Sequence, residues 1–146
     1  MKDTEPIRIQ HVFDVSPQTV WKAITDVEEM RQWYFEAIPD FKPEVGFETR
    51  FLIQNEGRNF THIWTVKKVI PRKIIGYIWN FEEYSGEGYT TFELAEEGMK
   101  TRLTLKNYVN EPFPDNIPEF KRESGLAGWD YFIKKNLRGY LEKTNK

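Results

Sequence analysis

The histidines are the side chains of this sequence best suited to acid–base chemistry near neutral pH. The chain has two histidines, His11 and His62, and no cysteine. His62 lies two residues from both Phe60 and Trp64, so in a strand these three side chains share one face. A histidine in an apolar pocket can hydrogen-bond a ligand or act as a base, and it can equally be a core residue satisfied by a neighbour. We expect His62 to face the interior and leave its role open, and the same holds for His11.

The motifs of metal, nucleophile and phosphate sites are missing from the sequence. The two histidines have neither His-x-His nor His-Glu-x-x-His spacing. Ser16, Ser85 and Ser124 lack the context of a nucleophile elbow. The glycine-rich segment 124–128 lacks the Lys and Ser/Thr of a phosphate loop. We therefore assign no catalytic residue, and we expect no metal and no cofactor.

Aromatic side chains are the unusual feature. The 146 residues include 5 Trp, 7 Tyr and 11 Phe. So many rings either fill a wide core or line a wide pocket, and pockets for small molecules are often lined by rings. Each ring taken singly is better explained by packing, whereas the set favours a cavity. The inward-facing candidates are Phe51, His62, Trp64, Tyr77, Trp79, Phe92, Trp129, Phe132 and Ile133, with Trp33 and Phe35 near the mouth and Asn107 among the polar groups that could orient a ligand.

The elements that position these side chains follow from periodicity and capping. Residues 7–14 alternate between apolar and polar, which predicts a strand. Ser16 is a good N-cap and Pro17 suits the first helical position, so a short helix follows. Asp26 can cap a second short helix that ends near Trp33.

Alternation returns after a proline-containing loop at 35–43. Strands are predicted around 45–54, 60–67, 75–81, 90–94 and 101–107, with turns or loops at 55–59, 71–73, 85–88 and 96–99. The proline-rich stretch 111–118 breaks the sheet pattern. A final helix follows, with an apolar stripe of Leu126, Trp129, Ile133, Leu137 and Leu141.

This order of elements predicts one α+β domain over residues 1–146. A curved antiparallel sheet of about six strands must cover its apolar face, and the long C-terminal helix is the element large enough to do so. Two short helices follow the first strand. A cavity remains between sheet and helix if the rings there do not close completely.

Charge and composition exclude several partners. The net charge is −2 and no basic stripe occurs, so we expect no nucleic acid. No apolar run spans a bilayer and no basic amphipathic helix occurs, so we expect no membrane. The lack of cysteines and of an N-terminal apolar signal core fits a cytoplasmic location.

Several short motifs occur together in one order along nearly the whole chain. They are Val15-Ser16-Pro17-x-x-Val20-Trp21-x-Ala23-Ile24-Thr25-Asp26 followed by Trp33, then Gly46-Phe47, Val66-x-x-Val69-x-Pro71, Thr101-Arg102-Leu103-Thr104-Leu105 and Gly128-Trp129. In this order they resemble the START/polyketide-cyclase (SRPBCC) superfamily, in the Aha-type branch named for the activator of the Hsp90 chaperone ATPase. Two positions depart from that pattern. Val45 replaces a frequent glycine, and Asn107 replaces a frequent histidine, which weakens any inherited catalytic role there.

The resemblance implies a helix-grip fold, in which the sheet wraps around the long helix and a cavity lies between them. It also implies binding of a small hydrophobic molecule that is lipid- or polyketide-like. Two alternatives stay open. The first is an enzyme, such as a cyclase, hydrolase or isomerase, that acts on a hydrophobic substrate in the same cavity. The second is a chaperone-interacting co-regulator.

Two features of the surface are also left open. The outward face of the sheet carries apolar side chains that could form a homodimer interface. They are Leu52, Ile63, Ile74, Ile78 and Tyr89. The proline-rich segment 112–118 could act as a lid over the cavity.

Overall fold

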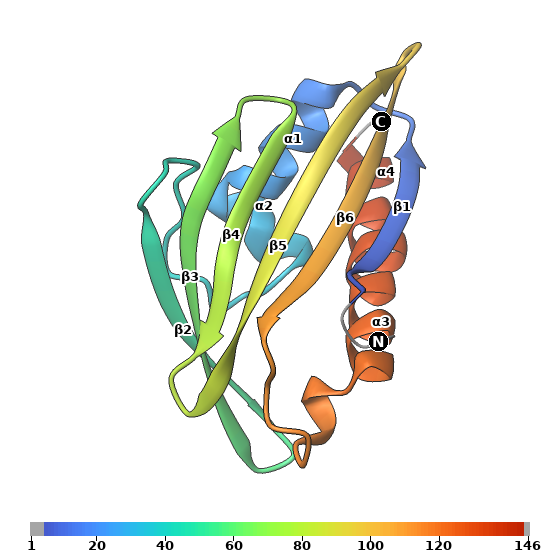
Figure 1. Cartoon of the computed structure of the whole chain (residues 1–146). Helices are drawn as coiled ribbons and strands as arrows, with labels where there is room; N and C mark the ends of the chain where they lie inside the picture. Colours follow the sequence, from blue (N-terminus) through green and yellow to red (C-terminus); the bar gives the residue numbers. More distant parts are fainter. Residues whose placement is uncertain (1–4, 145–146) are drawn as a thin grey trace.

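One curved sheet packed against helices on a single side makes up the molecule (Figure 1). The structure is a computed structural model that describes residues 5–144. The elements, in order, are β1 (Ile7–Phe13), α1 (Pro17–Thr25), α2 (Val27–Trp33), β2 (Glu48–Asn55), β3 (Arg58–Ile70), β4 (Ile74–Phe81), β5 (Tyr84–Glu97), β6 (Lys100–Glu111), the 3-10 turn η2 (Pro118–Phe120), α3 (Arg122–Asp130), the π-helical η3 (Tyr131–Leu137) and α4 (Arg138–Thr144). The predicted α+β helix-grip order is confirmed.

The six strands pair antiparallel in the order β1-β6-β5-β4-β3-β2. The β2–β3 turn places Glu56 at φ 52° and Gly57 at φ 78°, the left-handed pair that tight hairpins require. This turn fixes the register, so Phe51 pairs with His62. In the next ladder Trp64 pairs with Trp79. Register alone therefore lines up rings on the concave face.

The predicted loop at 85–88 is wrong, because β5 already begins at Tyr84. The turn lies instead at Glu82 and Glu83. Gly86 and Gly88 lie within the strand, where their lack of a side chain leaves room for Phe113. Gly86 has φ 115°, and a Cβ on it would collide with the ring of Phe113. A register shift between Glu87 and Gly88 accommodates this close approach within the strand.

The two short helices are capped as predicted. The Oγ of Ser16 accepts a hydrogen bond from the backbone N–H of Thr19 at 3.3 Å, and Pro17 occupies the first turn. The carboxylate of Asp26 accepts one from the N–H of Glu29 at 3.2 Å. These caps fix where α1 and α2 begin, and therefore where α2 ends and places Trp33.

The helical segments α3, η3 and α4 form one long helix that lies behind the sheet and runs alongside β1 (Figure 1). Its buried side chains, Trp129, Ile133, Leu137 and Leu141, recur every four residues. Because an α-helix turns in about 3.6 residues, a strict four-residue stripe drifts around it. The wider π-helical turns of η3 offset that drift and keep the stripe against the sheet.

Leu126 was predicted to join the stripe, and this is wrong, since it is 38% exposed. The same four-residue step places Gly125 toward the sheet instead. A Cβ on Gly125 would lie 2.9 Å from Cδ1 of Ile7. The helix therefore begins close to β1, and a larger residue at 125 would require the end of the Ile7 side chain to move.

Replacing Leu137 with alanine tests the contact between helix and sheet. Leu137 is fully buried, so we expect the variant to lose about 2–5 kcal/mol of unfolding free energy in urea titrations. The matched control is Lys134→Ala on the solvent side, whose ion pair with Asp130 is exposed and whose loss should cost under about 1 kcal/mol. Equal losses in both variants would contradict the packing described here.

Candidate ligand-binding site

The predicted site residues meet between the concave face of the sheet and the long helix. The aromatic ones, called the interior ring set below, are Phe51 from β2, His62 and Trp64 from β3, Tyr77 and Trp79 from β4, Phe92 from β5, Trp129 and Phe132 from the long helix, and Trp33 and Phe35 at the end of α2. Trp33, Trp64, Tyr77, Phe92 and Ile133 are fully buried. Phe35, Trp79 and Phe132 are half-buried.

The rings contact one another from the sheet across to the helix. The ring centroids of Trp64 and Trp79 lie 5.0 Å apart, and those of Trp79 and Trp129 lie 5.6 Å apart. Phe51 meets Trp64 edge-on at 4.9 Å. These are ordinary distances for packed aromatic pairs. In this conformation the side chains themselves occupy the centre of the seam between sheet and helix.

Phe35 holds a special position in this set, because it belongs to no helix or strand. Its ring centroid lies 5.1 Å from that of His62 and 5.1 Å from that of Phe132. It also lies 5.3 Å from Phe51 and 6.0 Å from Trp64. A loop residue thus places one ring between the sheet and the long helix.

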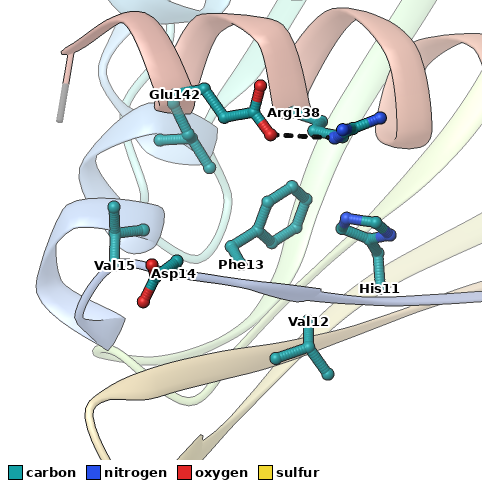
Figure 2. A pocket seen from close by; sticks show the side chains of 8 residues that line it. His11, Val12, Phe13, Asp14, Val15, Arg138 and Glu142 are labelled. Atoms are coloured by element: carbon teal, nitrogen blue, oxygen red, sulfur yellow. Dashed lines mark hydrogen bonds and ion pairs between the residues drawn. The ribbon is translucent and has the colours of Figure 1, made fainter. Parts of the chain in front are cut away.

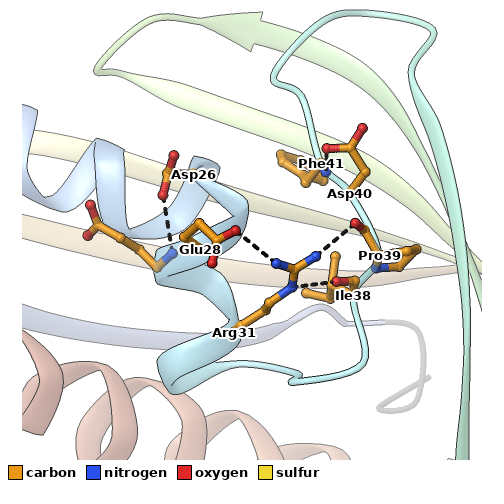
Figure 3. Close-up of polar contacts among 8 residues, drawn as sticks. Asp26, Glu28, Arg31, Ile38, Pro39, Asp40 and Phe41 are labelled. Atoms are coloured by element: carbon orange, nitrogen blue, oxygen red, sulfur yellow. Dashed lines mark hydrogen bonds and ion pairs between the residues drawn. The ribbon is translucent and has the colours of Figure 1, made fainter.

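The loop that carries Phe35 is tied to α2 by Arg31 (Figure 3). The guanidinium of Arg31 donates from Nε to the carbonyl of Ile38 at 2.8 Å and from Nη2 to that of Pro39 at 2.8 Å. Its Nη1 pairs with Glu28 at 3.0 Å. This clamp fixes both ends of the short segment around Phe35.

Tyr34 was not predicted, yet it lies at the centre of the ring set. It stacks on Trp33 at 4.5 Å and on Trp64 at 5.2 Å, and it is 7% exposed. Its hydroxyl lies 2.8 Å from that of Tyr77. Burial raises the pKa of both hydroxyls, so both phenols stay neutral. The sequence did offer one indication of this, because Tyr34 lies between the predicted site residues Trp33 and Phe35.

One fully buried polar atom of the ring set has no hydrogen-bond partner among residues 5–144. The indole Nε1 of Trp64 is buried and makes no hydrogen bond to any described residue. Buried donors are nearly always paired, and leaving one unpaired costs about 1–3 kcal/mol. The other indole at this depth, Trp33, donates from Nε1 to the carbonyl of Ala23 at 2.8 Å. The orphaned donor is therefore particular to Trp64.

His62 faces the interior and is 6% exposed. Its Nδ1 lies 3.0 Å from the carbonyl oxygen of Phe60, which can only accept, so Nδ1 carries the proton. Burial lowers the pKa of His62 to about 4. The imidazole is therefore neutral at pH 7 and a weak base. Its Nε2 remains able to accept a hydrogen bond.

Asn107, the predicted polar group on β6, is half-buried and already engaged. Its Nδ2 donates to the hydroxyl of Thr90 at 2.8 Å. Thr90 is fully buried and pairs with Tyr77 in the β4–β5 ladder. Asn107 thus lies near the ring set, in register with Tyr77 but separated from it by β5.

The segment 112–118 packs at the end of the sheet through Phe113, which forms a second ring group with Phe60, Phe81, Tyr84 and Phe120. Phe113 stacks on Phe120 at 5.0 Å and meets Phe81 at 5.7 Å. Glu119 accepts hydrogen bonds from Arg58 at 2.9 Å and from Asn55 at 2.6 Å. Glu119 directly follows the segment, so these bonds hold the C-terminal end of the segment to the β2–β3 hairpin. Whether it opens as a lid stays a prediction.

Two hollows lie elsewhere on the surface, and no residue of the ring set lines either. One, of about 300 Å³, lies between the end of β1 and α4. Figure 2 shows His11 there, pointing to the long helix near Arg138, which pairs with Glu142 at 2.9 Å. The other, of about 490 Å³, is lined by α1, the start of α2 and the loops near Phe41 and Pro71.

Metal-ligating side chains are scattered rather than clustered. Within residues 5–144, no group of three or more His, Cys, Asp and Glu side chains could hold a metal ion. No helix in the same range is long and apolar enough to cross a lipid bilayer.

Comparison with known families matches residues 14–142 to the family described as activator of Hsp90 ATPase homolog 1-like protein. The match begins directly after β1 and ends within α4, so it contains the whole ring set. No curated protein matches the chain in sequence.

Solved structures share the fold at low sequence identity. A protein from Chromobacterium violaceum is 21% identical, with 97% of this chain and 99% of that chain covered and a TM-score of 0.79. The Aha1 dimer from Colwellia psychrerythraea is 18% identical, with 94% and 96% covered and a TM-score of 0.71. DynU16, from the dynemicin biosynthetic locus, is 24% identical, with 94% and 47% covered and a TM-score of 0.74. At these identities the likeness concerns the fold alone.

The buried neutral His62 predicts a pH dependence of stability. Its pKa is about 4 in the folded protein, against 6.5 for an unperturbed histidine, so the unfolded chain binds the proton more tightly. The unfolding free energy should thus be full above about pH 6.5 and fall as the pH drops toward 4, by up to about 3 kcal/mol. His62→Phe should flatten this slope in urea titrations run at several pH values.

The matched control for that experiment is His11→Gln. Burial, then Arg138 and Lys134, lower the pKa of His11 as well, but His11 is only half-buried and lies on the edge strand β1. Its replacement should leave most of the slope in place. If His62→Phe retained the full slope, the buried neutral state of His62 would be wrong.

Proposed function

Because the chain belongs to the activator of Hsp90 ATPase homolog 1-like family, we propose that it binds a small apolar ligand between the sheet and the long helix. The observation that carries the proposal is the continuous ring set that joins the sheet to the helix and includes three half-buried rings. Those rings, Phe35, Trp79 and Phe132, come from a loop, a strand and the helix. Apolar ligands are typically bound by such convergent aromatic surfaces.

We propose that the ring of Phe35 occupies the place of the ligand in the structure described. It touches rings on both walls of the seam, and a loop can move a side chain with less disruption than a strand can. The two Arg31 bonds to the loop carbonyls hold the segment beyond Phe35, so the movement needed is local. The ligand then contacts the ring set in place of Phe35.

An enzyme is the second candidate, and its proposed base is weak. A general base works best with a pKa near the working pH, and burial lowers the pKa of His62 to about 4. Its neutral Nε2 is better suited to accepting a hydrogen bond from a ligand. We therefore rank binding above catalysis.

Interaction with other proteins stays a separate proposal. The family description supports a chaperone-related role, and one structural neighbour is described as a dimer. On the outward sheet face, Leu52 is 48% exposed, while Ile63, Ile74 and Ile78 are half-buried. Sedimentation showing a monomer at all concentrations would exclude a homodimer on this face. A pull-down from native lysate without a chaperone would count against the chaperone role.

Replacing Phe35 with alanine tests the proposed site. The variant should bind 1-aminoanthracene at least about fivefold more tightly than the unmodified protein, because no side chain competes for the space. Binding is measured by the rise in probe fluorescence in an apolar environment.

The control is Phe47→Ala, which removes another half-buried ring, just before β2. Phe47 packs on Phe41 at 5.9 Å, away from the contacts that Phe35 makes. It should leave the probe affinity unchanged. A Phe35→Ala affinity equal to that of the unmodified protein, or an equal gain in Phe47→Ala, would contradict the site.

A further inference from the structure

The buried hydrogen-bond donors of the ring set restrict which apolar ligand fits. Two of these donors have a proton without an acceptor. The first is the Nε1–H of Trp64, which has no partner among residues 5–144 and belongs to a side chain that is 1% exposed. An indole N–H can only donate, so it calls for an acceptor atom.

The second donor comes from the pair Tyr34–Tyr77. The two hydroxyls carry two protons and share one hydrogen bond of 2.8 Å, so one O–H proton is left over whichever oxygen donates. The Tyr34 ring lies 5.2 Å from that of Trp64, and the Tyr77 ring lies 4.8 Å from it. Both spare donors thus belong to three rings in direct contact.

The position of Phe35 connects these donors to the proposed site. Its ring centroid lies 4.9 Å from that of Tyr34 and 6.0 Å from that of Trp64. A flat ligand that takes the place of the Phe35 ring therefore lies next to the rings of Tyr34 and Trp64, which carry these donors. Phe35 has no polar side-chain atom and leaves the donors unsatisfied, whereas an oxygen on the ligand can accept from them.

Charge decides which oxygen suits this place. No lysine or arginine among residues 5–144 is buried, and the one histidine of the interior ring set, His62, is neutral at pH 7. A carboxylate buried there would lose its hydration without gaining a counter-ion, which is strongly unfavourable. A ketone or quinone oxygen accepts the same bonds at a much smaller desolvation cost.

We propose that Trp64 and the Tyr34–Tyr77 pair recognise a neutral carbonyl oxygen on the ligand, so that the chain selects ring ketones or quinones over hydrocarbons and fatty acids. This inference rests on the proposed function and goes beyond it by naming the ligand class.

The test compares 9-fluorenone with fluorene, two tricyclic compounds that differ in one carbonyl group. Dissociation constants are measured by equilibrium dialysis against the unmodified protein, with dodecanoate as a third probe. We expect 9-fluorenone to bind about tenfold more tightly than fluorene, as one good hydrogen bond provides. In spectra of ¹⁵N-labelled protein, the indole N–H signal of Trp64 should shift downfield with 9-fluorenone and not with fluorene.

A double variant tests the contribution of the tyrosine hydroxyls apart from that of the Trp64 indole. Removing both hydroxyls in Tyr34→Phe/Tyr77→Phe leaves no broken partner behind, so the protein should fold normally. It should lose most of the preference for 9-fluorenone. The control is Tyr84→Phe, whose ring packs in the second ring group against Phe60 and Phe120 and which should keep the preference.

Each outcome decides between the claims. Equal affinity for both tricycles, with an unmoved Trp64 signal, overturns the carbonyl inference and leaves ligand binding standing. Tighter binding of dodecanoate than of 9-fluorenone overturns the neutral-oxygen inference in the same way. Failure of all three probes to bind overturns the proposed function and the inference together. The comparison of probes needs only the unmodified protein, so it stands even if a variant fails to fold.

Discussion

The contact between the long helix and the concave face of the sheet determines the rest of the structure. The helix presents Trp129, Ile133 and Leu137 at four-residue steps, and its π-helical segment keeps this stripe facing the strands. Gly125 permits the close approach to β1 from which the helix starts. Because the sheet curves around this helix, the widest side chains of several elements converge in the seam between them. Removal of apolar surface from water drives that convergence.

The same packing creates a conflict between apolar filling and polar satisfaction. Rings close the seam efficiently, but indoles and phenols bring donors into a place where acceptors are few. Trp33 resolves the conflict with the carbonyl of Ala23, and His62 with that of Phe60. Trp64 does not, and the two phenols bond each other. An unsatisfied buried donor is a cost to stability that a ligand with an acceptor oxygen can remove.

The sequence was sufficient to predict the elements whose signals are local. The caps at Ser16 and Asp26 and the alternation of β2 to β6 led to the correct order and fold. Its failures depend on distant contacts. Glycines in β5 suggested a loop because the ring of Phe113 that they accommodate lies far along the chain. Leu126 was placed in the buried stripe because its spacing from Trp129 fits a helix. The contact that turns Gly125 toward the sheet instead is with Ile7, which is distant in sequence.

The candidate site was predictable as a group of rings and not in its details. Strand alternation placed Phe51, Trp64 and Trp79 on the inner face, as observed. Tyr34 was missed because it follows α2, where no periodicity applies. That the rings touch one another and that Phe35 lies among them depend on side-chain geometry, which no sequence pattern carries.

Native mass spectrometry of the freshly purified protein, set beside its denatured mass, tests ligand binding most directly. We expect an excess mass on the folded protein that disappears on denaturation, and whose value identifies an apolar compound with a carbonyl oxygen. A folded mass equal to that of the chain alone, unchanged after incubation with ring ketones, would contradict it. The ring set would then be only the core of the fold.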